Sequence, residues 1–390
     1  MFEKILKKIK PTEREEKEIK AKVNKFLGKL NKNISEGHVV VGGSFAKGTW
    51  LSGQHDIDVF VQFSTDENIS SKLEKAVKKS FKKYEVVHGS RDYFIVDFEE
   101  LSFEIIPILK INYSREAKNI TDISPLHVEW VKNNLNDRLK DEVRLAKHFC
   151  KANRIYGAET YIKGFHGYAL EILIVYYGSF LNLVKHASRW RYNTLIYTSH
   201  NEFFSSQEFP LTLIDPVNFK RNAASSLSCE KFELFVRVCK EFNKKKSLGF
   251  FKPKKISRKF FDIILKIIPL KGFSDVSGTK VLKVFEHISK SLDKEGFTVL
   301  NSDWEFDDVS FLYFKVKNKT LPKLVKHYGP PVKFTSDLEN FRNKYKNYNV
   351  ENGRAYVLLN REYVKVRDFI NHLLKDKDVK SMVKSIKLIN

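Results

Sequence analysis

The stretch VVVGGSFAKGTWLSGQHDIDVFVQF, residues 39–63, constrains the fold more strongly than any other part of the chain. An apolar segment breaks at two glycines, and a second apolar segment then carries Asp56 and Asp58, one residue apart. Because side chains alternate across a strand, both carboxylates project from one face while Ile57 and Val59 project into a core. The stretch therefore predicts a strand, a glycine turn that opens a short helix, and a second strand that presents two carboxylates together.

The context of the two carboxylates indicates a phosphate site beside a metal site. Two like charges this close repel unless a cation lies between them, and carboxylate oxygens are ligands that suit Mg²⁺. A lone Asp-x-Asp also occurs on surface strands, and a lone Gly-Gly-Ser is usually only a turn. Here, however, Gly43 and Ser44 would leave backbone N–H groups for a phosphate, and Lys47 would add a positive charge about one helical turn later.

A third carboxylate follows in LSFEIIPIL, where Glu104 interrupts an apolar strand. Three carboxylates can hold two Mg²⁺ ions roughly 3.5–4 Å apart, which activates an attacking hydroxyl and stabilises a leaving pyrophosphate. The alternative for Glu104 alone is an edge strand that exposes every second residue. Together with Asp56 and Asp58, Glu104 is the expected third metal ligand.

Hydrophobic periodicity divides the chain into three parts, which predict a multidomain α+β fold. In residues 1–133 a helix follows Pro11, with Thr12 and Glu15 as a capping box. This part continues with strands at residues 38–41, 56–63, 84–87, 91–98 and 101–109, and a helix at 70–84. Residues 134–250 are helical, and one buried helix over residues 167–184 would form their core. The basic stretch KKKSLGFFKPKKISRK marks the boundary to residues 251–390, a second α+β domain.

The charge balance indicates an acidic partner. The chain has 70 Lys and Arg against 47 Asp and Glu, a net charge of +23 and a pI of about 9.6. This surplus favours nucleic acid or an anionic membrane surface, although a lysine-rich genome produces the same bias. In residues 321–390 aromatic residues are interleaved with basic ones, a combination that grips phosphates and stacks on bases. A solvated charged face is the alternative for this segment.

Cysteine usage and the apolar segments favour a reduced, soluble, cytoplasmic protein. Cys150, Cys229 and Cys239 form no Cys-x-x-Cys pair, so neither a zinc site nor secretion is expected. The N-terminal MFEKILKKIK lacks the apolar region of a signal peptide. The apolar run at residues 167–184 is short for a membrane span and contains Glu171. No membrane partner is therefore expected.

The pattern G-S-x-A-x-G-T-W-x-x-G-x-x-D-I-D-V resembles the polymerase-beta-like nucleotidyltransferases. The longer resemblance is to the archaeal-type (class I) CCA-adding enzymes, and it covers residues 30–255. It continues through the segments SPLHVEWV, DEVRLAKHFCKANRIYGAETYIKGFHGYALEILIVYYGSF, DPVNFKRNAASSLS and SLGFFKPK. The resemblance implies a palm-like nucleotidyltransferase domain at residues 1–133, a helical central domain at 134–250 and a tRNA-binding domain at 251–390.

The resemblance also implies site residues, position by position. Asp56, Asp58 and Glu104 match the catalytic, metal-binding carboxylates, although the family usually has aspartate at the third position. The expected nucleotide-binding residues match the family's nucleotide site, and they are Gly43, Ser44, Lys47, His127, Lys147, Tyr156 and Arg221. From the residues alone, several have other interpretations. Lys147 fits a solvated lysine, Tyr156 a core residue, His127 a structural histidine, and Arg221 a salt bridge with Asp215.

The implied function is CCA addition to the tRNA 3′ end from CTP and ATP, with Mg²⁺ as cofactor and no nucleic-acid template. The C-terminal domain would hold the acceptor and TΨC region of the tRNA through charge and shape, although the C-terminal part is shorter than usual in this family. Two alternatives remain at this point: a poly(A) or poly(U) polymerase, and a non-catalytic RNA-binding protein on the same fold. Whether the chain is a monomer or a homodimer is left open.

Overall fold

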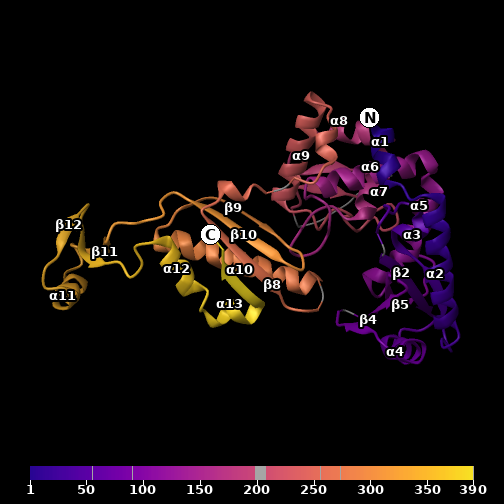
Figure 1. Cartoon of the computed structure of the whole chain (residues 1–390), viewed down its shortest axis with the longest axis horizontal. Coiled ribbons are helices and arrows are strands. Elements are labelled where there is room, and N and C mark those ends of the chain that lie inside the picture. The colour runs from indigo at the N-terminus through magenta and orange to yellow at the C-terminus, as the bar shows by residue number, and fades with distance from the viewer. Residues whose placement is uncertain (55, 90, 198–207, 255, 273, 390) are drawn as a thin grey trace. The chain divides into compact units, whose positions relative to one another are not determined.

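The computed structural model describes residues 1–389 except 55, 90, 198–207, 255 and 273, and the chain divides into two units, 1–254 and 255–390 (Figure 1). Each unit has its own hydrophobic cores. The division between the units lies within the basic stretch at residues 244–259. A further division of the first unit near residue 133 stays a prediction.

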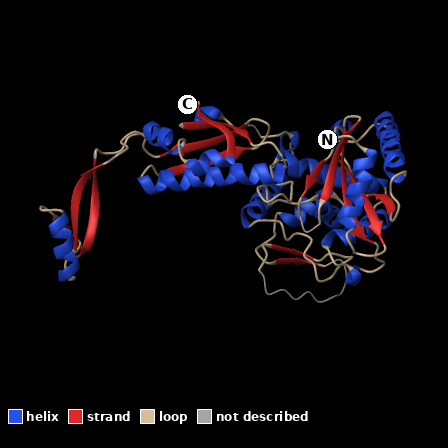
Figure 2. Ribbon diagram, turned by 90° about the horizontal axis from the view of Figure 1, so that it is seen from below, coloured by secondary structure: helices blue, strands red, loops and turns tan. Residues whose placement is uncertain are grey.

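A five-stranded sheet forms the first half of unit 1 (Figure 2). Its strands are β1 (His38–Val41), β2 (Asp56–Phe63), β3 (Glu85–Val87), β4 (Tyr93–Phe98) and β5 (Leu101–Leu109), in the order β1-β2-β5-β4-β3. β2 and β5 are parallel, and the other neighbours are antiparallel. The predicted bounds of β1, β2 and β5 are confirmed, and β3 and β4 begin one and two residues later than predicted. One face of the sheet, with Val59 and Phe103, packs against α2 (Glu13–Asn31) and α4 (Ile69–Ser80).

The predicted capping box of α2 is half correct. Thr12 is the N-cap, and its hydroxyl accepts a hydrogen bond from the Glu15 backbone N–H at 3.2 Å. The prediction of the reciprocal bond, from the Thr12 N–H to the Glu15 carboxylate, is wrong. That carboxylate instead accepts hydrogen bonds from Ser52 Oγ and the Gly53 N–H, at 2.8 and 3.0 Å. The start of α2 is thereby tied to the loop that enters β2.

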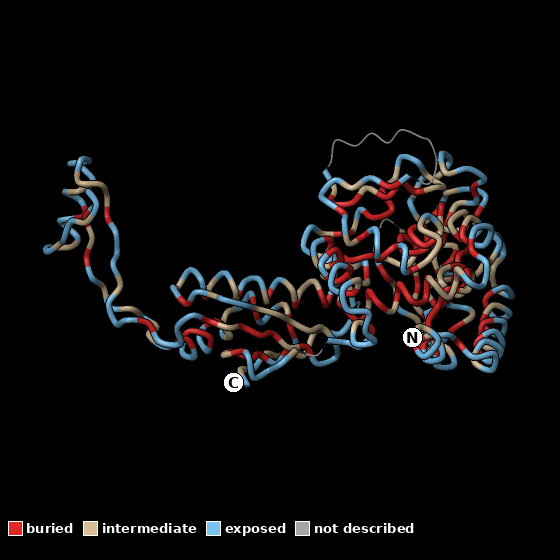
Figure 3. Tube along the Cα trace, turned by 90° about the horizontal axis from the view of Figure 1, so that it is seen from above, coloured by how far each residue is buried: buried red, intermediate tan, exposed pale blue. Residues whose placement is uncertain are grey.

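The second half of unit 1 is helical, as predicted. Its helices are α1 (Phe2–Ile9), α5 (Ser124–Asn134), α6 (Asp137–Ala152), α7 (Gly167–Tyr177), α8 (Phe180–Ala187) and α9 (Cys229–Lys244). A parallel pair of short strands, β6 (Thr194–Ile196) and β7 (Leu211–Leu213), accompanies them. These elements share one core, whose buried positions are red in Figure 3, and Ile5 and Ile9 of α1 belong to it.

The prediction of one helix over residues 167–184 is wrong. α7 ends at Tyr177 and is capped by Gly178, whose φ of +74° suits glycine. α8 begins after Ser179, whose hydroxyl accepts the Asn182 N–H at 3.2 Å. The two helices are bent by 94°. Among the described residues no single helix is long and apolar enough to cross a membrane, and only α7 and α8 taken together reach that length and composition.

The described residues of unit 2 form two antiparallel sheets. The first has the order β14-β8-β10-β9, from β8 (Ile263–Pro269), β9 (Val299–Glu305), β10 (Ser310–Val316) and β14 (Val383–Leu388). The helices α10 (Ser274–Glu295), α12 (Val366–Leu373) and α13 (Lys377–Met382) share its core. The second sheet joins β11 (Leu324–Pro331), β12 (Asn349–Glu351) and β13 (Arg354–Asn360), and α11 (Thr335–Lys344) packs Phe341 against Val357. The predicted mixed α+β character of this part is confirmed.

Candidate active site

The three predicted carboxylates lie on one face of the central strand pair. In the parallel register Asp58 is beside Glu104, and Asp56 is beside Ser102. Asp58 and Glu104 are half-buried, and Asp56 is exposed. Burial raises the pKa of Glu104 to about 7, and the charges of Asp58 and Asp56 add to the rise. Burial also raises the pKa of Asp58, while Lys47 opposes the rise. This face therefore has unfavourable negative charge that a cation would relieve.

The donor set fits a hard divalent cation. All three side chains offer carboxylate oxygens, the ligands that Mg²⁺ prefers. Within the described part of the chain, no group of three or more His, Cys, Asp and Glu side chains stands in metal-binding geometry. The three carboxylates thus share a face without forming a closed ligand set. The side chain of Glu104 is one methylene longer than those of Asp56 and Asp58.

The glycine pair brings the preceding loop into direct contact with β2. An added Cβ at Gly43, whose φ is +57°, would lie 1.6 Å from Asp58 Oδ2. At Gly42 it would lie 2.0 Å from a ring carbon of Phe60, and the Gly42 N–H donates to the Asp58 carbonyl at 2.8 Å. Only glycine allows this approach. The loop continues into the single-turn helix α3 (Gly43–Lys47), which places Ser44 half-buried in the same turn.

The two predicted phosphate lysines meet in a buried cluster around Glu171. Lys47 Nζ lies 2.9 Å from Glu171 Oε2, and Lys147 Nζ lies 3.1 Å from Oε1. The Thr49 hydroxyl donates to Oε1 at 2.6 Å. Although burial raises the pKa of Glu171, Lys47 and Lys147 bring it to about 2. Lys147 is 1% exposed, so the alternative of a solvated lysine is wrong. Sequence reasoning missed the role of Glu171 in this cluster, although a carboxylate in an apolar helix was the available signal.

A second cluster joins two of the predicted nucleotide-binding residues, His127 and Arg221, around Asp215. His127 Nε2 lies 3.0 Å from Asp215 Oδ2, and Arg221 Nη1 donates to the same oxygen at 2.9 Å. The Tyr168 hydroxyl donates to Oδ1 at 2.9 Å. Although burial raises the pKa of Asp215, the bond from His127 and the charges of His127 and Arg221 help to bring it to about 2. The salt bridge considered for Arg221 is therefore present.

Tyr168 connects the two clusters. Its ring stacks on His127, with 4.1 Å between the ring centroids, and Lys47 Nζ lies 4.8 Å from the Tyr168 centroid. An added Cβ at Gly167 would lie 3.2 Å from Lys147 Nζ and 3.3 Å from the Tyr156 hydroxyl. Tyr156, which is half-buried, therefore also points toward the lysine cluster. All the predicted nucleotide-binding residues belong to this connected set or to the glycine loop beside it.

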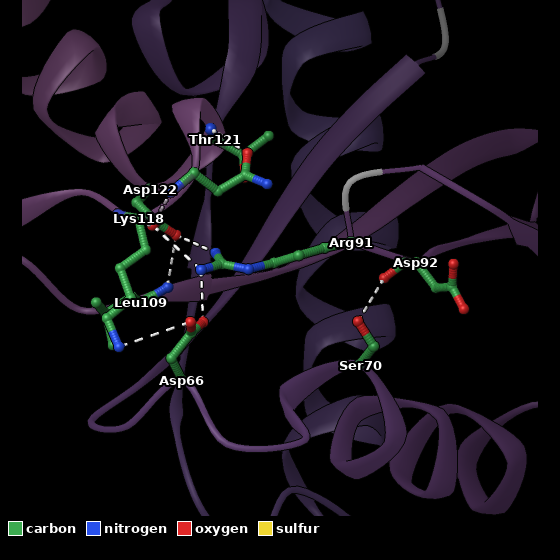
Figure 4. Close-up of polar contacts among 9 residues, drawn as sticks. Asp66, Ser70, Arg91, Asp92, Leu109, Lys118, Thr121 and Asp122 are labelled. Atoms are coloured by element: carbon green, nitrogen blue, oxygen red, sulfur yellow. Dashed lines mark hydrogen bonds and ion pairs between the residues drawn. The ribbon is translucent and has the colours of Figure 1, made fainter.

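A separate buried carboxylate, Asp122, lies where β2 and β5 end (Figure 4). It accepts backbone bonds from Leu109, Lys118 and Asn119 at 2.8 to 3.0 Å. Arg91 donates to Asp122 and also to Asp66, the latter at 2.6 Å. Asp122 thus closes the turn after β5, at the opposite end of these strands from Asp56.

Comparison with known proteins covers nearly the whole chain. Residues 20–144 match the nucleotidyltransferase domain, 141–252 the second domain of tRNA nucleotidyltransferase, and 274–388 the C-terminal domain of the CCA-adding enzyme. The CCA-adding enzyme of Methanosarcina mazei is 31% identical over 95% of this chain and 88% of its own length. That of Nanoarchaeum equitans is 35% identical over 90% of this chain and 89% of its own length.

Solved structures agree with the fold at much lower identity. A structure of the Cid1 poly(U) polymerase with Mg and 3′-dATP bound has a TM-score of 0.52 at 13% identity, covering 65% of this chain and 98% of that one. A cytoplasmic RNA terminal U-transferase has a TM-score of 0.51 at 15% identity, covering 65% and 98%. These likenesses confirm a nucleotidyltransferase fold, and the sequence comparisons confirm the predicted family. The chain belongs to the CCA-adding enzymes, which are tRNA nucleotidyltransferases.

Proposed function

We propose that this nucleotidyltransferase adds C, C and A to the 3′ end of tRNA, using CTP and ATP without a nucleic-acid template. The observation that carries the proposal is the register that sets Asp58 beside Glu104, with the Gly43 loop pressed against the Asp58 carboxylate. A nucleotide phosphate held by that loop would lie next to a cation-binding face. This is the arrangement that phosphoryl transfer requires.

Asp56, Asp58 and Glu104 would hold Mg²⁺. When bound there, the cation would activate the attacking hydroxyl and neutralise negative charge on the phosphates. The tRNA 3′-hydroxyl attacks the nucleotide α-phosphate, and pyrophosphate leaves. The loop at Gly43 and Ser44 presents backbone N–H groups to the phosphates. These chain residues orient the triphosphate relative to the carboxylate face.

The neighbouring clusters supply charge and base recognition. Lys47 and Lys147 place positive charge beside the loop. Arg221 is fixed by Asp215 through one nitrogen, and its guanidinium carries five N–H donors in a planar fork. The fork suits the edge of a base, which lysine cannot match. Selection between CTP and ATP would then come from protein groups together with the RNA end.

The C-terminal unit would hold the acceptor and TΨC region of the tRNA. On the sheet of β11, β12 and β13, Lys326 Nζ lies 4.8 Å from the Tyr356 ring centroid, and Tyr328 is exposed. Exposed rings and basic side chains together bind RNA through stacking and phosphate contacts. The net charge of +23 supports the same partner.

The test is incorporation of labelled CTP and ATP, with Mg²⁺, into a tRNA transcript that ends before CCA. Extension that stops after three residues supports CCA addition. A long homopolymer tail would identify a poly(A) or poly(U) polymerase instead, and no incorporation would indicate a non-catalytic RNA-binding protein. Omission of Mg²⁺ with a chelator present should abolish incorporation if the carboxylates act through the metal.

A further inference from the structure

The charge arrangement around Glu171 assigns it a role that the reaction scheme leaves out. We infer that Glu171 is a positioning residue: one buried carboxylate holds the side chains of Lys47 and Lys147, and thereby fixes their positive charge beside the loop that carries Gly43 and Ser44. The inference rests on the proposed function, because it concerns the nucleotide phosphates. Glu171 is not a catalytic residue, since it acts through the two lysines.

Glu171 is a costly residue for its location. It is 1% exposed, and its neighbours on α7, Leu170 and Ile172, are fully buried. An unpaired charge there would be strongly unfavourable. Its bonds to the described residues all come from other elements: Lys47 from α3, Thr49 from the loop after α3, and Lys147 from α6. Glu171 therefore joins the loop that carries Gly43, Ser44 and Lys47 to the helices α6 and α7.

The loop is held at both ends by different means. At its start, the Gly42 N–H bonds to the Asp58 carbonyl. At its end, Arg144 donates to the carbonyls of Gly48 and Trp50 at 2.7 and 3.1 Å. These contacts fix the backbone, whereas Glu171 fixes the charged side chain of Lys47. Loss of the Glu171 charge should therefore leave the loop folded but displace the positive charge.

Burial lowers the pKa of Lys147 while Glu171 opposes this, and with both lysines protonated the cluster carries one more positive charge than negative charge. Two ammonium groups share a single carboxylate, and the charges of both lysines act on Asp58, the carboxylate that contacts the loop. The surplus positive charge therefore acts on the region beside Asp58 where a triphosphate would bind. Positive charge that is already in position stabilises phosphate anions. Without Glu171, the two lysines would repel each other and Lys47 would turn toward Asp58.

The test is equilibrium binding of CTP in the presence of Mg²⁺, measured by calorimetry, for Glu171→Gln, Lys147→Met and the double variant. Glu171→Gln should raise the Kd for CTP about tenfold or more, as expected for loss of a charge-assisted hydrogen bond. Removal of Lys147 from this variant relieves the repulsion, so the double variant should bind CTP more tightly than the product of the single effects predicts. Glu171→Asp, which keeps the charge, should recover part of the loss.

A control variant and a stability measurement separate the possible outcomes. Asp122→Asn removes an equally buried carboxylate and should leave the Kd for CTP within about twofold, because the partners that the structure describes for Asp122 include neither Lys47, Lys147 nor the Gly43 loop. If Glu171→Gln lowers the Tm but leaves the Kd for CTP unchanged, Glu171 is merely structural and the inference is overturned; multiplicative effects in the double variant also overturn it. Since the readout is binding, a wild-type protein that binds CTP but does not add CCA would refute only the proposed function.

Discussion

The buried carboxylates Asp122 and Glu171, both in unit 1, lie in clusters that differ in charge balance and in bonding. In the cluster of Asp122, two carboxylates (with Asp66) meet two cations, Arg91 and Lys118, and Asp122 bonds mainly to backbone N–H groups. In the cluster of Glu171, one carboxylate meets two lysines, and its bonds to the described residues come from side chains. The difference leads to an expectation for each cluster. The charges around Asp122 balance and it bonds to the backbone, so we expect it to stabilise the fold, whereas the two lysines on Glu171 should favour an anionic ligand nearby.

The largest expected effect is loss of activity when one of the carboxylates Asp56, Asp58 and Glu104 is removed. Asp58→Asn should lower CCA incorporation by roughly 10²–10³-fold or more, because the cation loses a ligand beside the loop. Since burial raises the pKa of Asp58, its charge disfavours the folded state without metal, so this variant should unfold at an equal or higher temperature. Filter binding should show unchanged affinity for tRNA. Activity that survived the change would exclude the carboxylates as the metal site.

The second prediction concerns the balanced cluster. Asp122→Asn leaves Arg91 without its buried partner and should reduce the free energy of unfolding by about 3 kcal/mol. Urea denaturation measures the loss, and the specific activity of the folded fraction should stay near that of wild type. A variant that is stable but inactive would break the distinction between the two clusters.

The third prediction tests whether Arg221, in the cluster around Asp215, recognises the base of the incoming nucleotide. Arg221→Lys keeps the positive charge near Asp215 but loses the planar fork, so discrimination between CTP and UTP should fall about tenfold. Competition assays with both nucleotides measure the ratio of kcat/KM. Unchanged discrimination would assign Arg221 only to its salt bridge with Asp215.

The smallest effect is a pH dependence of stability. With a chelator present to remove metal ions, burial raises the pKa of Glu104 in the folded state to about 7, against 4.5 for an ordinary glutamate. As pH rises, Glu104 therefore loses its proton at a lower pH in the unfolded chain than in the folded protein. Its contribution to the free energy of unfolding is full below about pH 4.5 and is lost as pH rises through about 7. Glu104→Gln should remove that part of the slope in denaturation curves measured between these pH values. An identical slope in both proteins would contradict the assigned environment of Glu104.

Local patterns were sufficient to predict much of the sheet. Alternation located β2 and β5 to the residue, and Glu104 was recognised because it interrupts an apolar strand. The register of Asp58 beside Glu104 could not be predicted, because parallel pairing joins segments far apart in the sequence. The break between α7 and α8 was missed although Gly178 and Ser179 carry the usual end and start signals. There the continuous apolar run outweighed the local signals.

The clusters were beyond prediction for a different reason. Each site lysine was expected to contact phosphate directly, because a sequence does not show that Glu171 lies between them. Their burial depends on how α3, α6 and α7 pack together, which periodicity does not specify. The pairing of Arg221 with Asp215 was foreseeable, since the two lie six residues apart.

The most direct test of CCA addition compares three tRNA transcripts that end before CCA, after the first C and after the second C. Each is incubated with Mg²⁺, CTP and ATP, and the products are resolved at single-nucleotide length. A site that selects nucleotides by protein groups and the RNA end should extend all three to the same terminal A and stop. Products that grow by the same number of residues from every start, or tails without a fixed end, would contradict this account.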